Sequence, residues 1–194
     1  MSVLVAGANR FVGISLCKCF AKVGGFARSV IRSLRPQRFD VGDIEICSLQ
    51  SEMDWTTELK CAQQAVYLAS WMHAKADKSS DLLSKLRRTN LDETVSHARH
   101  AVATSLRRFI TLGTIKVNGE FTAQGCPLSV ADAPAPEDSY GVSEQEAEGE
   151  LHRIAMDTGF DSMMRQLVHG ILLLQKTGAV PLHWIIGPHR SSLA

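Results

Sequence analysis

Tyr140 and Glu144 are the side chains whose types and spacing bear most directly on proton chemistry. They lie four residues apart in a segment expected to be helical, so they share one helix face. A free tyrosine has a pKa of about 10, which a nearby cation lowers and a nearby carboxylate raises. The pair therefore predicts a tyrosine that is hard to ionise. The alternative is that Glu144 is a solvated residue beside Glu146 and Glu148, and that Tyr140 merely packs.

A glycine-spaced loop follows the apolar run at residues 2–6 and precedes a helical pattern. It reads Gly7, Ala8, Asn9, Arg10, Phe11, Val12, Gly13. At such a place the backbone N–H groups and the dipole of the helix hold the pyrophosphate of a dinucleotide. Gly7 permits the tight turn, and Gly13 permits close packing of the helix on the strand. The alternative is a plain strand-to-helix turn that binds nothing.

Three arginines modify this predicted dinucleotide site. Arg10 stands where such loops usually have a middle glycine, and its side chain either obstructs the phosphates or pairs with them as a cation. Arg32 ends the second expected strand and Arg35 follows it, at a place where an acidic residue favours NAD and an arginine accommodates the 2′-phosphate of NADP. They favour NADP, unless both are exposed loop residues. The expected cofactor is therefore NAD or NADP.

The elements that must position these groups alternate between strand and helix patterns. Short apolar runs predict strands at residues 2–6, 27–32, 44–49, 65–69, 108–112 and 162–168. Helical patterns cover residues 12–22, 55–63, 81–106 and 143–158. This alternation predicts an α/β fold, in which a doubly wound parallel sheet is covered by helices on both faces.

The composition argues against several classes of function. The 194 residues carry a formal net charge of +1, so no attraction to nucleic acid or to an anionic membrane is expected. The chain starts on an apolar strand without the basic start of a signal peptide, and no apolar run has the length of a membrane span. Its five cysteines form no CxxC pair, so no metal site is expected. These features predict a cytoplasmic protein with reduced thiols.

Several motifs occur in an order that is typical of one known family. After the glycine loop they are GDI at residues 42–44, VYLAS at 66–70, NLDET at 90–94, TIKVNGE at 114–120 and YGVS at 140–143. Over most of its length the chain resembles the extended short-chain dehydrogenase/reductases of the NAD-dependent epimerase/dehydratase family. Within that family it resembles the bacterial nucleotide-sugar 4-epimerases of the UDP-glucose 4-epimerase type.

The resemblance implies a role for each matching residue. In such enzymes a tyrosine is the acid/base on a sugar hydroxyl while hydride passes between C4 and the nicotinamide, and a serine or threonine hydrogen-bonds the same oxygen. A lysine four residues after the tyrosine binds the nicotinamide ribose and lowers the tyrosine pKa. Carried over, Tyr140 is the acid/base, Thr114 is the hydroxyl and Glu144 occupies the lysine position. The residues expected at the cofactor are Gly7, Asn9, Arg10, Phe11, Val12, Gly13, Arg32, Asp43, Ile44, Leu68, Ala69, Ser70 and Asn90.

The resemblance also implies a domain organisation and partners. Residues 1–170 would form a Rossmann-like NAD(P)-binding domain, and residues 171–194 would be the remnant of a largely missing domain that grips the sugar nucleotide. A UDP-sugar substrate and a homodimer through the two long helices are expected by analogy. Because Glu144 opposes the chemistry, three functions stay open: an epimerase of reduced activity, a non-catalytic cofactor-binding protein and a decayed gene product.

Overall fold

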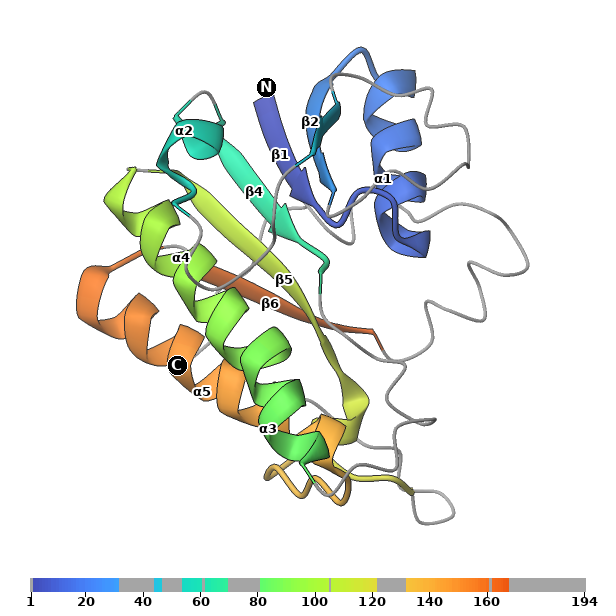
Figure 1. Cartoon of the computed structure of the whole chain (residues 1–194), viewed down its shortest axis with the longest axis vertical. Helices are drawn as coiled ribbons and strands as arrows, with labels where there is room; N and C mark the ends of the chain where they lie inside the picture. Colours follow the sequence, from blue (N-terminus) through green and yellow to red (C-terminus); the bar gives the residue numbers. More distant parts are fainter. Residues whose placement is uncertain are drawn as a thin grey trace.

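The computed structural model describes residues 2–31, 44–46, 54–60, 62–69, 81–104, 106–121, 132–160 and 162–167, which carry colour in Figure 1. The strands are β1 (Ser2–Ala6), β2 (Phe26–Ile31), β3 (Ile44–Ile46), β4 (Gln64–Tyr67), β5 (Arg108–Thr114) and β6 (Ser162–Leu167). The α-helices are α1 (Phe11–Lys22), α2 (Thr56–Leu59), α3 (Leu82–Leu86), α4 (Glu93–Ala103) and α5 (Ser139–Thr158). A π-helical turn, η2 (Arg87–Asp92), joins α3 to α4, and a 3-10 turn, η3 (Ile115–Val117), follows β5.

The described strands form one parallel sheet in the order β3-β2-β1-β4-β5-β6. The chain enters at a central strand, builds one half of the sheet outward to β3, and then builds the other half outward from β4. This confirms the expected doubly wound α/β fold. In such sheets ligands bind beyond the carboxyl ends of the strands, at the point where the strand order reverses. Here that point lies between β1 and β4.

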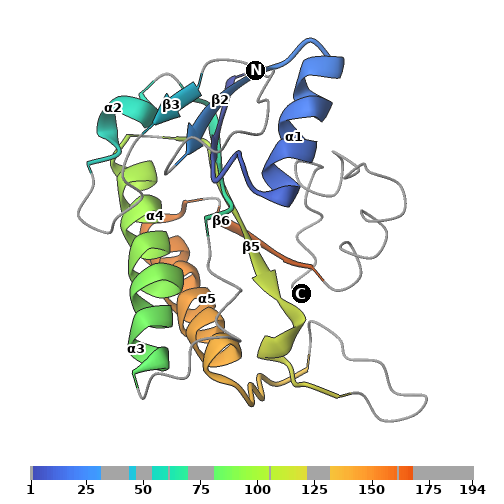
Figure 2. The ribbon, with the colours of Figure 1, turned by 45° about the vertical axis from the view of Figure 1, so that its right-hand side comes forward.

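The core has two layers because successive side chains of a strand point to opposite faces of the sheet. Val3 and Val5 of β1 pack in the layer that contains Leu16 and Phe20 of α1. Leu4 and Ala6 lie in the opposite layer, with Ala98 and Ala101 of α4 and Leu151 of α5. Figures 1 and 2 show α1 on one face of the sheet and α4 and α5 side by side on the other.

The helix α5 begins four residues before the predicted start at residue 143. Asp138 caps it, because Oδ1 of its carboxylate accepts a hydrogen bond of 2.6 Å from the backbone N–H of Gly141. Gly159 ends the helix in the left-handed conformation, with φ +66°. The early start places Tyr140 in the first turn of α5.

Two other helical predictions need correction. The helix expected at residues 55–63 is only the four residues Thr56–Leu59, because the N–H of Gln63 already bonds the carbonyl of Ser2 in β1. The continuous helix expected at residues 81–106 is divided by the π-helical turn Arg87–Asp92. Among the residues that the structure describes, no helix combines the length and apolar character that crossing a membrane requires.

His97 is a buried histidine of α4, on the side of the helix that faces the sheet. Its ring stacks on Trp55 at 4.1 Å between centroids, and contacts Tyr67 and Phe109 at 5.0 and 5.4 Å. Within the described part of the chain neither ring nitrogen has a hydrogen-bond partner. Burial lowers the pKa of His97 to about 3, and the charge of His100 adds to this lowering. His97 is therefore neutral in the folded chain.

We expect this histidine to make the fold acid-sensitive. Below its ordinary pKa of about 6.5 the unfolded chain binds a proton at His97, but the folded chain binds it only near pH 3. The stabilising contribution is therefore full above pH 6.5 and is lost as the pH falls toward 3, by at most ~1.4 kcal/mol per pH unit. Urea unfolding from pH 7 to pH 4 measures this slope.

The substitution His97→Phe should flatten that slope, since phenylalanine keeps the ring packing and cannot titrate. His152→Gln is the matched control, because His152 is exposed on α5. The control should keep the slope of the unmodified chain. Parallel slopes for the unmodified chain and His97→Phe would contradict the assignment.

Candidate active site

The glycine loop lies at the carboxyl edge of the sheet, where hydrogen bonds connect the ends of β1, β2 and β4. The N–H of Gly7 donates to the carbonyl of Val30 in β2 at 2.9 Å, and the N–H of Leu68 donates to the carbonyl of Ala6 at 2.8 Å. Gly7 has φ +80°, and a Cβ at this residue would lie 2.9 Å from the carbonyl carbon of Leu68. The loop therefore occupies the point of reversal of the strand order, and only glycine fits its first position.

Gly13 brings the first turn of α1 onto this loop. A Cβ at Gly13 would lie 2.5 Å from the carbonyl oxygen of Gly7 and 2.7 Å from Cα of Ala8. Arg10 is the N-cap residue of α1, in an extended conformation, and its side chain makes no capping hydrogen bond. The first turn also contains no acidic residue. Backbone N–H groups of a first turn have no partner within their own helix, so this end of α1 suits an anion.

The structure brings most of the predicted cofactor residues together at this edge. Val12 packs against the core and Phe11 is 52% exposed. The buried Leu68 and Ala69 directly follow β4. Ile44 is the exception among the described residues of this set on the sheet, because it begins the edge strand β3 at its amino end, level with Ser29 of β2. The loop itself supplies Gly7, Asn9, Arg10 and Gly13, whereas Arg32, Asp43 and Ser70 lie outside the described residues.

Asn90, also predicted to contact the cofactor, has a partner within the protein. It lies in the π-helical turn, is 1% exposed, and its amide Nδ2 donates to Oγ of Ser143 in α5 at 3.1 Å. The hydroxyl of Ser143 in turn donates to the carbonyl of Tyr140 at 2.8 Å. Asn90 thus supports the helical turn that carries Tyr140.

Thr114, Tyr140 and Glu144 meet at the end of β5. Thr114 is the last residue of that strand, Tyr140 lies in the first turn of α5, and the Thr114 hydroxyl is close enough to lower the pKa of Tyr140. Glu144 follows one helical turn later and is only 3% exposed. The alternative of a solvated Glu144 is therefore wrong. Its Oε1 has no hydrogen-bond partner among the described residues, while the carboxyl is hydrogen-bonded to Tyr140.

Both groups of this pair hold their protons more tightly than usual. Burial raises the pKa of Tyr140 far above its ordinary value, and the charge of Glu144 raises it further, against the opposing hydrogen bond from Thr114. Burial also raises the pKa of Glu144 to about 8, and the charge of Glu148 contributes in the same direction. At neutral pH the site therefore presents a neutral phenol beside a carboxyl that is mostly neutral.

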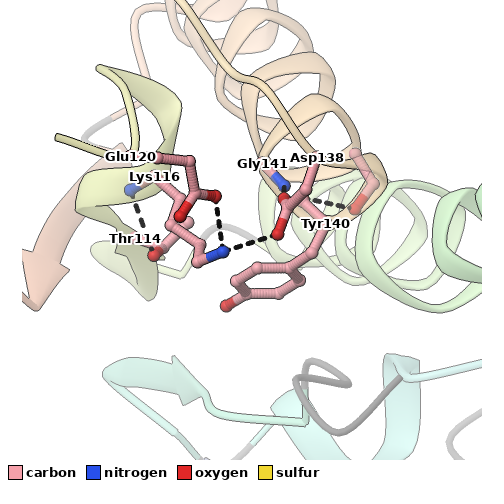
Figure 3. Close-up of polar contacts among 7 residues, drawn as sticks. Thr114, Lys116, Glu120, Asp138, Tyr140 and Gly141 are labelled. Atoms are coloured by element: carbon pink, nitrogen blue, oxygen red, sulfur yellow. Dashed lines mark hydrogen bonds and ion pairs between the residues drawn. The ribbon is translucent and has the colours of Figure 1, made fainter. Parts of the chain in front are cut away.

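Lys116 is a residue of this site to which the sequence analysis assigned no role. Its ammonium Nζ bonds Oε1 of Glu120 and Oδ2 of Asp138, each at 2.5 Å (Figure 3). The i,i+4 spacing of Lys116 and Glu120 is a visible signal of an ion pair, but the contact with Asp138 bridges 22 positions of the chain. Within the described ranges, no group of three or more histidine, cysteine or acidic side chains is placed to hold a metal ion.

A comparison with protein families decides the affiliation of the chain. Residues 3–170 match the model of the NAD dependent epimerase/dehydratase family. The chain belongs to this family. The resemblance inferred from the ordered motifs is thus confirmed at the level of the family.

Members of the epimerase/dehydratase family with known activities are similar to this chain. A UDP-glucose 4-epimerase of Vibrio cholerae is 35% identical over 165 residues, which cover 82% of this chain and 49% of that protein. This chain therefore spans about half the length of the curated relative that it matches.

Solved structures of the epimerase/dehydratase type share the fold. MoeE5 in complex with UDP-glucuronic acid and NAD superposes with a TM-score of 0.72 at 21% identity, over 86% of this chain and 53% of that chain. The UDP-glucuronic acid 4-epimerase from Bacillus cereus, in complex with UDP-glucuronic acid and NAD, gives a TM-score of 0.73 at 18% identity, over 84% and 55% of the two chains.

Proposed function

We propose that this chain is an NAD-binding member of the epimerase/dehydratase family in which proton transfer at Tyr140 has been suppressed. The observation that carries the proposal is the buried carboxyl of Glu144 beside the Tyr140 hydroxyl. In this proposal the dinucleotide is retained, and UDP-sugar 4-epimerisation is lost or very slow. Residues 1–170 form the dinucleotide-binding domain. A cytoplasmic location remains a prediction from the composition of the sequence, and a homodimer remains a prediction from the resemblance.

The glycine loop supports retention of the dinucleotide. At both Gly7 and Gly13 a side chain would collide with backbone atoms, so the loop keeps the close fit that a pyrophosphate cradle requires. The adjoining first turn of α1 carries no carboxylate that would repel a phosphate. NAD is the favoured cofactor because the similar structures of MoeE5 and of the Bacillus cereus epimerase are complexes with NAD.

The suppression of chemistry follows from the state of Tyr140. When bound, NAD would supply the reversible hydride transfer at C4 of the sugar. Tyr140 would take the proton of the 4-hydroxyl, and the Thr114 hydroxyl would hydrogen-bond the same oxygen. A neutral phenol cannot take a proton, and each pH unit by which its pKa exceeds the ambient pH lowers the reactive fraction tenfold. Burial and Glu144 both act in that direction.

A paired binding and turnover experiment tests this proposal. We expect NADH fluorescence to titrate saturably with the purified chain, whereas UDP-glucose and UDP-galactose should not interconvert above background. NADPH serves as the second ligand, because the predicted role of Arg32 favours NADP. Interconversion by the unmodified chain at the rate of an ordinary epimerase would overturn the suppressed site. Failure of both dinucleotides to bind folded protein would overturn cofactor retention.

A further inference from the structure

Lys116 connects the segment that ends in Thr114 to the helix that carries Tyr140. Its backbone N–H donates to Oγ of Thr114 at 3.3 Å, and its side chain extends from η3 to Asp138 at the start of α5. Figure 3 shows the ammonium between the carboxylates of Glu120 and Asp138, close to the Tyr140 ring. Lys116 thus contacts both the Thr114 hydroxyl at the end of β5 and the Asp138 carboxylate that caps α5.

A second contact, through the backbone, binds the same two segments. Asp138 uses Oδ2 for Lys116 and Oδ1 for the N–H of Gly141, so the ion pair and the helix cap share one carboxylate. A Cβ at Gly141 would lie 2.8 Å from the carbonyl oxygen of Lys116 and 3.0 Å from Cβ of Pro136. The first turn of α5 is therefore pressed directly against the backbone of Lys116.

The charges in this cluster favour the contact. Burial by itself lowers the pKa of Lys116, but its hydrogen bonds to Asp138 and Glu120 outweigh burial and raise it. Burial raises the pKa of Asp138, but the bonds from Gly141 and Lys116 lower it overall. Both groups are therefore charged at neutral pH. The ammonium offsets a carboxylate whose own field acts on Tyr140.

We propose that Lys116 is a positioning residue for the Thr114–Tyr140 pair, holding η3 against the first turn of α5 so that the Thr114 hydroxyl stays beside the Tyr140 hydroxyl. This inference rests on the proposed function only where it treats these hydroxyls as the reacting groups. The contacts that carry it do not involve the dinucleotide. Lys116 acts through Asp138 and Thr114, and it does not replace the lysine that the family has at position 144.

The ionisation of Tyr140 is the readout that a purely structural lysine would not change. The chain has two tyrosines, so Tyr67→Phe leaves Tyr140 as the only one. Adding Glu144→Lys brings its ionisation into a measurable range, and tyrosinate absorbance then gives the midpoint. We expect Lys116→Met to raise this midpoint by about one pH unit or more. Lys116→Arg keeps the cation and should leave the midpoint at the value of the parent that has Lys116. A lower melting temperature with an unchanged midpoint would overturn the proposal.

A double substitution separates positioning from simple charge neutralisation. In Lys116→Met/Asp138→Asn the carboxylate whose charge raises the pKa of Tyr140 is gone, but the connection between η3 and α5 is still broken. A midpoint that stays raised supports positioning, because the Thr114 hydrogen bond that favours tyrosinate has been weakened. A midpoint that returns to the parent value means that Lys116 only neutralises Asp138, which overturns the proposal.

Amide hydrogen exchange provides a second test in the chain without other substitutions. Lys116→Met should speed exchange at Gly141 about tenfold or more, whereas Lys116→Arg should leave it slow and Leu151 should be unaffected in both variants. Unchanged exchange at Gly141 would overturn the proposal. Neither readout requires bound NADH or turnover, so failure of the proposed function is recognised separately.

Discussion

Replacing Glu144 by lysine is expected to lower the pKa of Tyr140, which lies far above its ordinary value of about 10 in the unmodified chain. In the unmodified chain burial and the Glu144 carboxyl both disfavour the tyrosinate, and only the Thr114 hydrogen bond favours it. An ammonium one helical turn from the phenol reverses the second of these effects. Each pH unit by which the pKa of Tyr140 falls corresponds to about a tenfold increase in tyrosinate near neutrality.

Absorbance titration of tyrosinate in the Tyr67→Phe background measures this change directly. Glu144→Gln is the matched control, because it removes the charge, keeps the size and adds no cation. Its midpoint should fall between those of the glutamate and lysine forms. The carboxylate of Glu148 should stabilise the new ammonium. Glu148 lies one turn further along α5, and its charge already acts on the side chain at position 144. A lysine form that titrates at or above the midpoint of the glutamine form would show that burial alone governs Tyr140.

Gly13→Ala is expected to abolish dinucleotide binding and to lower the free energy of unfolding by about 3 kcal/mol. The new Cβ would lie 2.5 Å from the Gly7 carbonyl oxygen and 2.7 Å from Cα of Ala8, both backbone atoms that cannot rotate away. Relief of this contact requires α1 to move off the end of β1. The N-terminal turn of α1 would then leave the loop that it forms with Gly7.

Gly149→Ala is the matched control for that substitution. Gly149 lies inside α5, and a Cβ there meets no atom within 4 Å. The control should gain up to about 1 kcal/mol from helix propensity and should bind NADH as before. Urea unfolding and NADH fluorescence measure both quantities. Normal NADH affinity in Gly13→Ala would show that the close approach of α1 is not needed for the ligand.

The sheet could be predicted from the sequence because its signals are local. The apolar run Val3, Leu4, Val5, Ala6 predicts a strand buried on both faces, and each of its residues is at most 1% exposed. The reversal of strand order followed from the alternation of strands and helices. The sequence pattern predicts the start of α5 four residues late, because Ser139 and Tyr140 lie before the first clear helical pattern and that pattern does not reach the cap at Asp138.

The site was less predictable because its decisive contacts are distant along the chain. Tyr140 and Glu144 could be paired from their spacing, but the burial of Glu144 depends on what α5 packs against, and the surrounding glutamates suggested a solvated face. Lys116 reaches Asp138 across a segment without helix or strand signals, so spacing gave no indication of the bond. The cofactor roles of Arg32, Asp43 and Ser70 stay predictions.

The π-helical turn between α3 and α4 sets the rotational phase of the helix before it. Such a turn contains one residue more than an α-helical turn, and each residue of an α-helix advances the side-chain direction by about 100°. Removal of one residue from Arg87–Asp92 would leave α4 in place but rotate α3, carrying the buried Leu86 away from the interior. It would also separate Asn90 from Ser143. Variants with one residue more or fewer in this turn would therefore differ in the rotation of α3 about its axis. They would loosen the support beneath Tyr140 without changing Thr114, Tyr140 or Glu144.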